Sequence, residues 1–175
     1  MKVRAIYPGT FDPIHYGHLD LMYRASAIFD ELIVAVYDHG VPSKSLLFDA
    51  GERVAMIEES LDGRTNIKIM RYGGLTVDFA RDIGAAVIVR GLRVFSDFEF
   101  EFRMALANQR LNPNVEVVTF ITREQHTFLS GTTVREIASF GGDVSSMVPP
   151  NVGIALRARF QKDSSDYNRP VTLRD

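Results

Sequence analysis

Five short apolar segments, each followed by a stretch with helical spacing, constrain the fold of this chain more than any other feature. The segments are residues 3–7, 32–37, 66–70, 85–89 and 115–121. Nearly continuous apolar runs of this length are typical of strands that are covered on both faces, as in a parallel sheet. The chain is therefore predicted to be an α/β protein.

The connections between these segments carry the signals of amphipathic helices. One of them begins with Asp49 and has Glu52 three residues later, which is a capping box. The expected helices are residues 18–29, 49–61, 76–84, 97–111, 132–142 and 151–161. Strands that alternate with helices through right-handed crossovers predict a single doubly wound, open, parallel five-stranded sheet of Rossmann-like type, with C-terminal helices added.

Length and composition predict one domain and exclude several classes of function. The chain has 175 residues, of which 46% are hydrophobic, a net charge of −2 and no cysteine. Disulfides, thiolate metal sites and cysteine nucleophiles are thereby excluded, and the charge argues against a nucleic-acid partner. No apolar run approaches the roughly 18 residues that span a bilayer, so we expect a cytoplasmic protein without a membrane partner. One domain is expected over residues 1–161, followed by a polar, mobile tail over 162–175.

The residues that directly follow the strands are the first candidates for a binding site, because parallel sheets bind ligands outside the carboxyl ends of their strands. These residues are mostly hydrogen-bond donors and cations, with few acids, and such a group suits a ligand with several phosphates. The residues that this edge of the sheet should bring together are Thr10, His18, Lys44, Arg90, Arg93 and Thr132.

The stretch "GTFDPIHYGH", residues 9–18, connects the first strand to the first helix. Gly17 has no side chain where the helix should begin, so a phosphate could reach the backbone N–H groups there and His18 could donate to it. A surface turn with incidental histidines explains the stretch equally well. A zinc pair would require other spacing and acidic neighbours.

Several motifs together resemble a known family. The stretch "GTFDPIHYGH", with "RGLR" after the fourth strand and "SGTTVRE" after the fifth, is similar to the HxGH nucleotidyltransferase superfamily. Longer stretches, "YPGTFDPIHYGH", "PSKS", "LTVDFA", "VIVRGLRVFSDFEFE" and "GDVSSMVPPNV", resemble the bacterial phosphopantetheine adenylyltransferases from near Lys2 to near Phe160. The resemblance favours the phosphate-binding interpretation of the first connection.

The resemblance implies an enzyme that transfers an adenylyl group from ATP to 4′-phosphopantetheine, giving dephospho-coenzyme A and pyrophosphate, the penultimate step of coenzyme A biosynthesis. It implies a reversible, in-line attack of the substrate phosphate on the α-phosphorus, without a general base because that phosphate is already ionised. Mg²⁺ would be carried by the ATP phosphates, with no metal ligand from the protein. A homohexamer and feedback binding of coenzyme A are also implied.

The resemblance assigns roles to individual residues. His18 would hold the α-phosphate, Thr10 would contact the reacting phosphates, and Lys44 would bridge the acceptor phosphate and the α-phosphate. Arg93 would bind the β- and γ-phosphates and complete this catalytic set, and Arg90 would bind the phosphopantetheine phosphate. The implied ATP-binding residues are Thr10, Phe11, His18, Gly91, Leu92, Arg93, Glu101, His126, Thr127, Phe128, Leu129, Ser130, Gly131 and Thr132. The implied acceptor-binding residues are Thr10, Lys44, Leu75, Thr76 and Arg90.

Three residues depart from the pattern of the resemblance. Gly131 stands where a hydroxyl residue is common, His126 where an aromatic residue is common, and Phe100 where tyrosine is common. Gly131 puts in question a phosphate contact, His126 a stacking contact, and Phe100 a polar contact to the pantetheine arm. Simpler roles also stay open, since Glu101 could pair with a nearby arginine and Thr132 could serve as an N-cap.

Two other functions stay open at this point. Another adenylyl- or cytidylyltransferase with the same scaffold could act on a different phosphate acceptor, and a nucleotide-binding regulatory module could have lost its activity. The expected helix over 97–111 has apolar residues on more than one side, so it is either fully buried or part of a subunit interface. The implied homohexamer favours the interface.

Overall fold

The computed structural model describes residues 2–38, 40 and 46–167 of the chain. Its centre is a five-stranded sheet in which all neighbouring strands are parallel, with the order β3-β2-β1-β4-β5. The strands are β1 (Arg4–Gly9), β2 (Glu31–Tyr37), β3 (Ile67–Tyr72), β4 (Val87–Leu92) and β5 (Glu116–Ile121). The predicted doubly wound open sheet is confirmed, and its strand order reverses between β1 and β4.

The helices follow the strands as the sequence predicts. They are α1 (Tyr16–Ser26), α2 (Ala50–Ser60), α3 (Thr76–Asp82), α4 (Phe95–Leu111), α5 (Gly131–Ser139) and α6 (Pro150–Tyr167), with a short 3₁₀ helix η1 (Glu124–His126) before α5. The capping box of α2 is confirmed, because the Asp49 carboxylate accepts from the Glu52 N–H at 2.8 Å and the Glu52 side chain accepts from the Asp49 N–H.

Several element boundaries differ from the prediction. Helix α1 begins at Tyr16 rather than at residue 18, because the His15 side chain caps it. Helix α5 begins at Gly131, and its N-cap is Ser130, whose hydroxyl accepts from the Thr133 N–H at 3.0 Å, so the proposed N-cap role of Thr132 is wrong. Strand β4 extends beyond the predicted end at residue 89 as far as Leu92. Its backbone pairs with β5 over these residues, and such pairing does not depend on the side chains. Helix α6 continues into the predicted tail as far as Tyr167.

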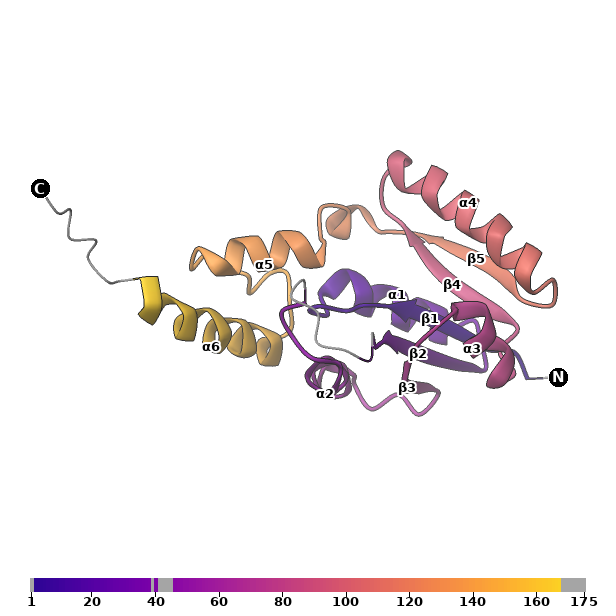
Figure 1. Cartoon of the computed structure of the whole chain (residues 1–175), viewed down its shortest axis with the longest axis horizontal. Coiled ribbons are helices and arrows are strands. Elements are labelled where there is room, and N and C mark those ends of the chain that lie inside the picture. Colours follow the sequence, from indigo (N-terminus) through magenta and orange to yellow (C-terminus); the bar gives the residue numbers. More distant parts are fainter. Residues whose placement is uncertain (1, 39, 41–45, 168–175) are drawn as a thin grey trace, which may run out of the picture.

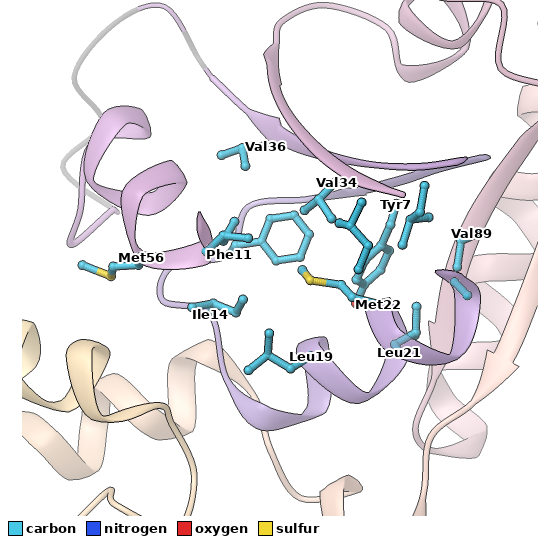
Figure 2. Close-up of a cluster of buried hydrophobic side chains, with 14 of the residues drawn as sticks. Tyr7, Phe11, Ile14, Leu19, Leu21, Met22, Val34, Val36, Met56 and Val89 are labelled. Atoms are coloured by element: carbon cyan, nitrogen blue, oxygen red, sulfur yellow. The ribbon is translucent and has the colours of Figure 1, made fainter. Parts of the chain in front are cut away.

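The core lies on both faces of the sheet, as a doubly wound fold requires. On one face, α6 packs on α2 and α5 packs on α6, and α1 and α2 pack against side chains such as Tyr7 and Val34. Figure 2 shows Phe11, Met22 and Leu21 gathered with them between the strands and α1. The smaller second cluster joins α3 to the opposite face around Ile6 and Ile88.

Helix α4 lies alongside β4 and β5 (Figure 1) and buries none of its residues. Phe98, Phe102 and Leu106 are each about half exposed, and Phe95 is 91% exposed. The interpretation of this helix as fully buried is therefore wrong for the single chain. In the part of the chain that the structure describes, no helix is both long and apolar enough to cross a membrane.

Candidate active site

A cavity of about 400 Å³ opens at the carboxyl ends of β1 and β4, where the strand order reverses. Parallel sheets bind ligands at this position. Its wall is formed by the two connections that follow these strands, by the first turn of α4 and by the segment from η1 to α5. The predicted residues in this wall are Phe11, His18, Arg90, Gly91, Arg93, Glu101, His126, Leu129, Ser130 and Gly131.

Other predicted residues that the structure describes are not in this wall. Thr10 is exposed between the wall residues Gly9 and Phe11, and Leu92 lies in a shallow apolar depression nearby. The remaining residues outside the wall are Leu75, Thr76, Thr127, Phe128 and Thr132. Lys44, the predicted bridging lysine, lies outside the described residues.

The wall also contains residues that the sequence analysis did not select. They are Tyr7, Pro8, Gly9, His15, Gly17, Leu21, Ser96, Asp97, Phe100 and Thr122. Most are small or apolar and carry no signal beyond packing. Asp97 could have been found, because it stands four residues after Arg93 at the start of a helix, the spacing at which an acid and a base meet.

The side chains of His15 and His18 each accept a hydrogen bond from the backbone of the other residue at the start of α1. The Nδ1 atom of His15 accepts from the His18 N–H, and the Nδ1 atom of His18 accepts from the His15 N–H, both at 3.3 Å. The two rings stack with their centroids 3.6 Å apart. Two of the N–H groups that a helix start leaves unpaired are thereby satisfied.

This arrangement fixes where the proton of each neutral ring lies. A neutral imidazole has one N–H, and an Nδ1 atom that accepts a hydrogen bond leaves that proton on Nε2. Burial lowers the pKa of His18 well below its usual value, and the charges of His15 and Arg93 lower it further. His18 is therefore a neutral donor through Nε2–H at neutral pH.

The folding stability is expected to decrease as the pH falls, because His15 is buried as a neutral ring. Burial lowers the pKa of His15 to about 3, with smaller contributions from Arg93 and His126. In the unfolded chain a histidine takes up a proton near pH 6.5, so the stability is complete above that pH and is lost as the pH falls toward 3. His15 alone should cost about 2 kcal/mol of unfolding free energy between pH 6.5 and pH 5.

Urea titrations at pH 7.5 and pH 5.0 measure this loss. The matched variant is His15→Asn, which retains an oxygen to cap α1 but cannot titrate. The unfolding free energy of His15→Asn is expected to change less with pH than that of the wild type. The difference is the contribution of the one proton that His15 takes up on unfolding. If the unfolding free energies of the wild type and His15→Asn depend equally on pH, the assignment of the pH dependence to His15 is wrong.

Two glycines make room for rings of this first connection. A Cβ atom at Gly9 would lie 2.8 Å from Cζ of Phe11, and one at Gly17 would lie 3.1 Å from Nδ1 of His15. Phe11 has a φ of 52°, a left-handed conformation that is strained for a phenylalanine. Its ring is 3% exposed and meets His18 edge to face at 5.0 Å, so Phe11 supports the histidine from the core.

The two predicted arginines are paired with acids, so the site holds less free positive charge than the sequence suggests. Nε and Nη2 of Arg90 each donate to Glu101 at 2.7 Å. Burial alone would lower the pKa of Arg90, but the hydrogen bonds and charge of Glu101 raise it. Arg93 donates from Nε to Asp97 at 3.1 Å and from Nη1 to the Leu129 carbonyl at 3.2 Å. A buried guanidinium without such partners would be costly.

A second, smaller cavity of about 110 Å³ adjoins the first one. The two cavities share Pro8, Arg90, Phe100 and Glu101. Thr76, which the sequence assigns to the acceptor, lies in the wall of this second cavity. Arg90 therefore lies at the junction of two compartments, one reaching the HxGH histidines and one reaching α3 and the inner side of α4.

The charged groups of the main cavity suit a polyphosphate better than a protein-bound metal ion. Among the described residues there is no group of three or more histidine, aspartate or glutamate side chains that could hold a metal. The two carboxylates of the wall, Asp97 and Glu101, already pair with arginines. Helix α5 starts at Gly131 in the same wall, and the free N–H groups of a helix start attract anions.

Comparison with known proteins agrees with this geometry. Residues 6–137 match the model of the cytidylyltransferase-like family. The chain is 51% identical over 156 residues to a phosphopantetheine adenylyltransferase of Roseiflexus sp. (strain RS-1), covering 89% of this chain and 96% of the relative. It is 51% identical over 160 residues to the phosphopantetheine adenylyltransferase of Methylococcus capsulatus, covering 91% and 98%.

Solved structures with low sequence identity share the fold. A bifunctional NMN adenylyltransferase/ADP-ribose pyrophosphatase from Francisella tularensis has a TM-score of 0.68 at 16% identity, covering 96% of this chain and 53% of that protein. A nicotinate-nucleotide adenylyltransferase structure from Vibrio parahaemolyticus has a TM-score of 0.63 at 19% identity, covering 90% and 99%. The extent of the sequence matches goes beyond shared fold, and the chain belongs to the phosphopantetheine adenylyltransferases of the cytidylyltransferase-like family.

Proposed function

We propose that this protein is a cytoplasmic enzyme that transfers the adenylyl group of ATP to 4′-phosphopantetheine, giving dephospho-coenzyme A and pyrophosphate. The position of Arg90 carries the proposal, because its guanidinium lies at the junction of two cavities. In the reaction, the acceptor phosphate must stand between the nucleotide and the pantetheine arm. Arg90 is in the right place to bind that phosphate with bidentate geometry.

The transfer exchanges one phosphoanhydride bond for another. An oxygen of the acceptor phosphate attacks the α-phosphorus in line, a new P–O bond forms, and the bond to the bridging oxygen of the β-phosphate breaks. Pyrophosphate leaves with the electron pair of that bond, and the similar energies of the two anhydrides make the step reversible. The attacking oxygen carries no proton at neutral pH, so no general base is required.

Fixed donors around the α-phosphate supply the catalysis. His18 donates from Nε2 to a non-bridging oxygen, where charge develops in the transition state. Arg93 and the first N–H groups of α5 hold the β- and γ-phosphates that leave. Thr10 and Lys44 stay predicted contacts of the reacting phosphates. Mg²⁺ enters as part of the substrate MgATP, where it neutralises phosphate charge.

The pantetheine arm is assigned to the second cavity. Beyond Arg90 and Glu101, its wall combines the polar Thr76 and Asn108 with apolar groups such as Phe100 and Met104, which matches an arm of methylenes and amides. The Thr76 hydroxyl already bonds to the Tyr72 hydroxyl at 3.0 Å, so its position is fixed before the substrate binds. Phe100, which departs from the common tyrosine, supplies an apolar contact in place of a hydroxyl.

The direct test measures pyrophosphate release from MgATP with different acceptors. We expect release with 4′-phosphopantetheine and formation of dephospho-coenzyme A by mass spectrometry. Nicotinate mononucleotide, and glycerol phosphate with ATP or CTP, are expected to give no release. Release with one of these acceptors alone would overturn the substrate assignment and retain the transfer chemistry. No release with any acceptor would leave a nucleotide-binding module without activity.

Helix α4 is proposed to form the interface of a homohexamer. It presents Phe95, Phe98, Phe102 and Leu106 to the outside, and stacked pairs join the first three of these rings. Sedimentation velocity at micromolar concentration is expected to show a hexamer for the wild type and smaller species for Phe102→Glu, which buries a charge in the interface. The matched variant Arg110→Glu changes charge at the other end of the helix. A monomeric wild type would overturn this proposal.

Coenzyme A is proposed to inhibit the enzyme by occupying the substrate cavities. It contains both the adenine nucleotide and the pantetheine arm, so one molecule should fill the two cavities that meet at Arg90. We expect competitive inhibition against ATP and against 4′-phosphopantetheine in initial-rate measurements. Inhibition that is non-competitive with both substrates would place coenzyme A elsewhere.

A further inference from the structure

Two buried charged side chains, Asp12 and Arg53, bridge the same two connections of the fold. Asp12 belongs to the β1–α1 connection, residues 10–15, and is 4% exposed. Arg53 lies in the first turns of α2, next to the end of the β2–α2 connection that the structure describes, residues 46–49, and is 1% exposed. Neither side chain is in the wall of the main cavity.

Asp12 binds the backbone of the β2–α2 connection with both carboxylate oxygens. Its Oδ2 accepts from the Leu47 N–H and its Oδ1 accepts from the Phe48 N–H, each at 2.9 Å. A carboxylate that accepts two N–H groups in this way fixes the direction of both peptide groups. Leu47 and Phe48 are therefore held to a residue that lies between Phe11 and His15 in the sequence.

Whereas Asp12 accepts hydrogen bonds from backbone N–H groups, Arg53 donates hydrogen bonds to backbone carbonyl groups. Its Nη1 donates to the Thr10 carbonyl at 2.6 Å and to the Tyr37 carbonyl at 2.9 Å, and its Nε donates to the Phe48 carbonyl at 3.1 Å. One guanidinium thus joins the end of β1, the end of β2 and the start of α2. The peptide groups on both sides of Phe48 are bound, one by Asp12 and the other by Arg53.

Arg135 of α5 adds a third element to this group. Its Nη1 donates to the Asp12 carbonyl and lies 3.3 Å from Oδ2 of Asp12. A Cβ atom at Gly131 would lie 3.0 Å from the Asp12 carbonyl oxygen and 3.4 Å from Nη1 of Arg135. The missing side chain at Gly131 therefore leaves space for the start of α5 to approach Asp12.

Buried charges of this kind are an expensive way to stabilise a fold. Removing a carboxylate and a guanidinium from water costs several kcal/mol each, and apolar side chains of similar size often stabilise a protein as well or better. Here every bond of Asp12 and Arg53 goes to the backbone at the ends of β1 and β2 or just before α2, or to Arg135 of α5. Such bonds determine where the connections lie more than they determine whether the chain folds.

We propose that Asp12 and Arg53 are positioning residues for the transfer reaction, holding the β1–α1 connection, with Phe11, His15 and His18, in register with the β2–α2 connection. The inference rests on the proposed function. Asp12 acts on the second connection through Leu47 and Phe48, which are among its described residues. Small errors in the placement of reacting groups cost large factors in rate, and both residues act through the backbone rather than by touching a substrate.

The test compares Asp12→Asn and Arg53→Lys with the wild type. Asparagine has the size of aspartate but presents an N–H₂ group to one of the two N–H donors, and lysine retains the charge but cannot reach three carbonyls. We expect kcat to fall by about 10- to 100-fold and the KM for ATP to change by less than about threefold. Asp49→Ala is the matched control, because it removes the cap of the same helix without a bond to the β1–α1 connection. It should lower the melting temperature and leave kcat unchanged.

Amide hydrogen exchange gives a readout that needs no substrate. The Leu47 and Phe48 amides of the wild type should exchange as slowly as core amides, and Asp12→Asn should accelerate them selectively. Fast exchange of these amides in the wild type would overturn the inference, as would unchanged kcat in both variants. Arg53→Lys decides the question if Asp12→Asn does not fold. A wild type that forms no dephospho-coenzyme A refutes the proposed function, whereas the exchange rates still report on the bridge itself.

Discussion

Replacing His18 by alanine is expected to lower kcat by about 10²- to 10³-fold and to change the Kd for ATP much less. The Nε2–H of His18 is fixed by the bond that Nδ1 accepts from the His15 N–H. A donor held in this way loses no orientational freedom when charge develops on the α-phosphate. Its contribution is therefore greatest in the transition state, and its removal should change turnover more than nucleotide binding.

Two further variants of His18 separate donation from helix capping. Glutamine places an amide N–H near the position of Nε2, whereas asparagine places polar atoms only near the position of Nδ1. We expect His18→Gln to retain more activity than His18→Asn, and His18→Asn to resemble His18→Ala in single-turnover measurements. The opposite order would mean that His18 acts by capping α1. Equal losses of turnover and ATP affinity in all three variants would indicate a binding role alone.

Replacing Arg90 by methionine is expected to lower kcat/KM for 4′-phosphopantetheine by about 10²- to 10³-fold, which is the effect of removing one partner of a partly buried charge pair. Two causes act together. The acceptor phosphate loses its bidentate donor, and Glu101 is left beside that phosphate as an unpaired negative charge. The Kd for ATP, measured by calorimetry without the acceptor, should change far less.

The double variant Arg90→Met/Glu101→Gln distinguishes the two causes. Removing the unpaired charge should restore part of the thermal stability and part of kcat/KM, and the remaining loss measures the contacts of Arg90 with the acceptor. Glu101→Gln alone provides the fourth corner of the cycle. If Arg90→Met weakens ATP as much as the acceptor, the assignment of Arg90 to the cavity junction is wrong.

The fold could be predicted almost completely because its signals are local. Each buried strand is a continuous apolar run, and each helix has periodic apolar residues with a cap or a glycine at its ends. Two of the wrong predictions concern helix starts, where more than one residue could serve as the N-cap. His15 capped α1 through its ring nitrogen, a role usually filled by a hydroxyl or carboxylate, and Ser130 rather than Thr132 capped α5.

The candidate site could be predicted only in outline. The rule that ligands bind at strand ends placed His18, Arg90 and Arg93 at one cavity. The sequence left open that Glu101 pairs with a nearby arginine, but the choice of Arg90 depends on tertiary structure, because Glu101 reaches it only when α4 folds back along β4. The bridge from Asp12 to Leu47 joins residues 35 positions apart, and no periodicity in the sequence reports on such a contact.

Helix α4 supplies Asp97, Phe100 and Glu101 to the cavities, although none of its residues is buried in the single chain. Few apolar contacts therefore resist its displacement, and the partner of Arg90 moves whenever the helix does. Whatever covers the outer face of α4 sets the shape of the acceptor cavity from the other side. If the proposed homohexamer forms through this face, specific activity is expected to fall when dilution dissociates the subunits.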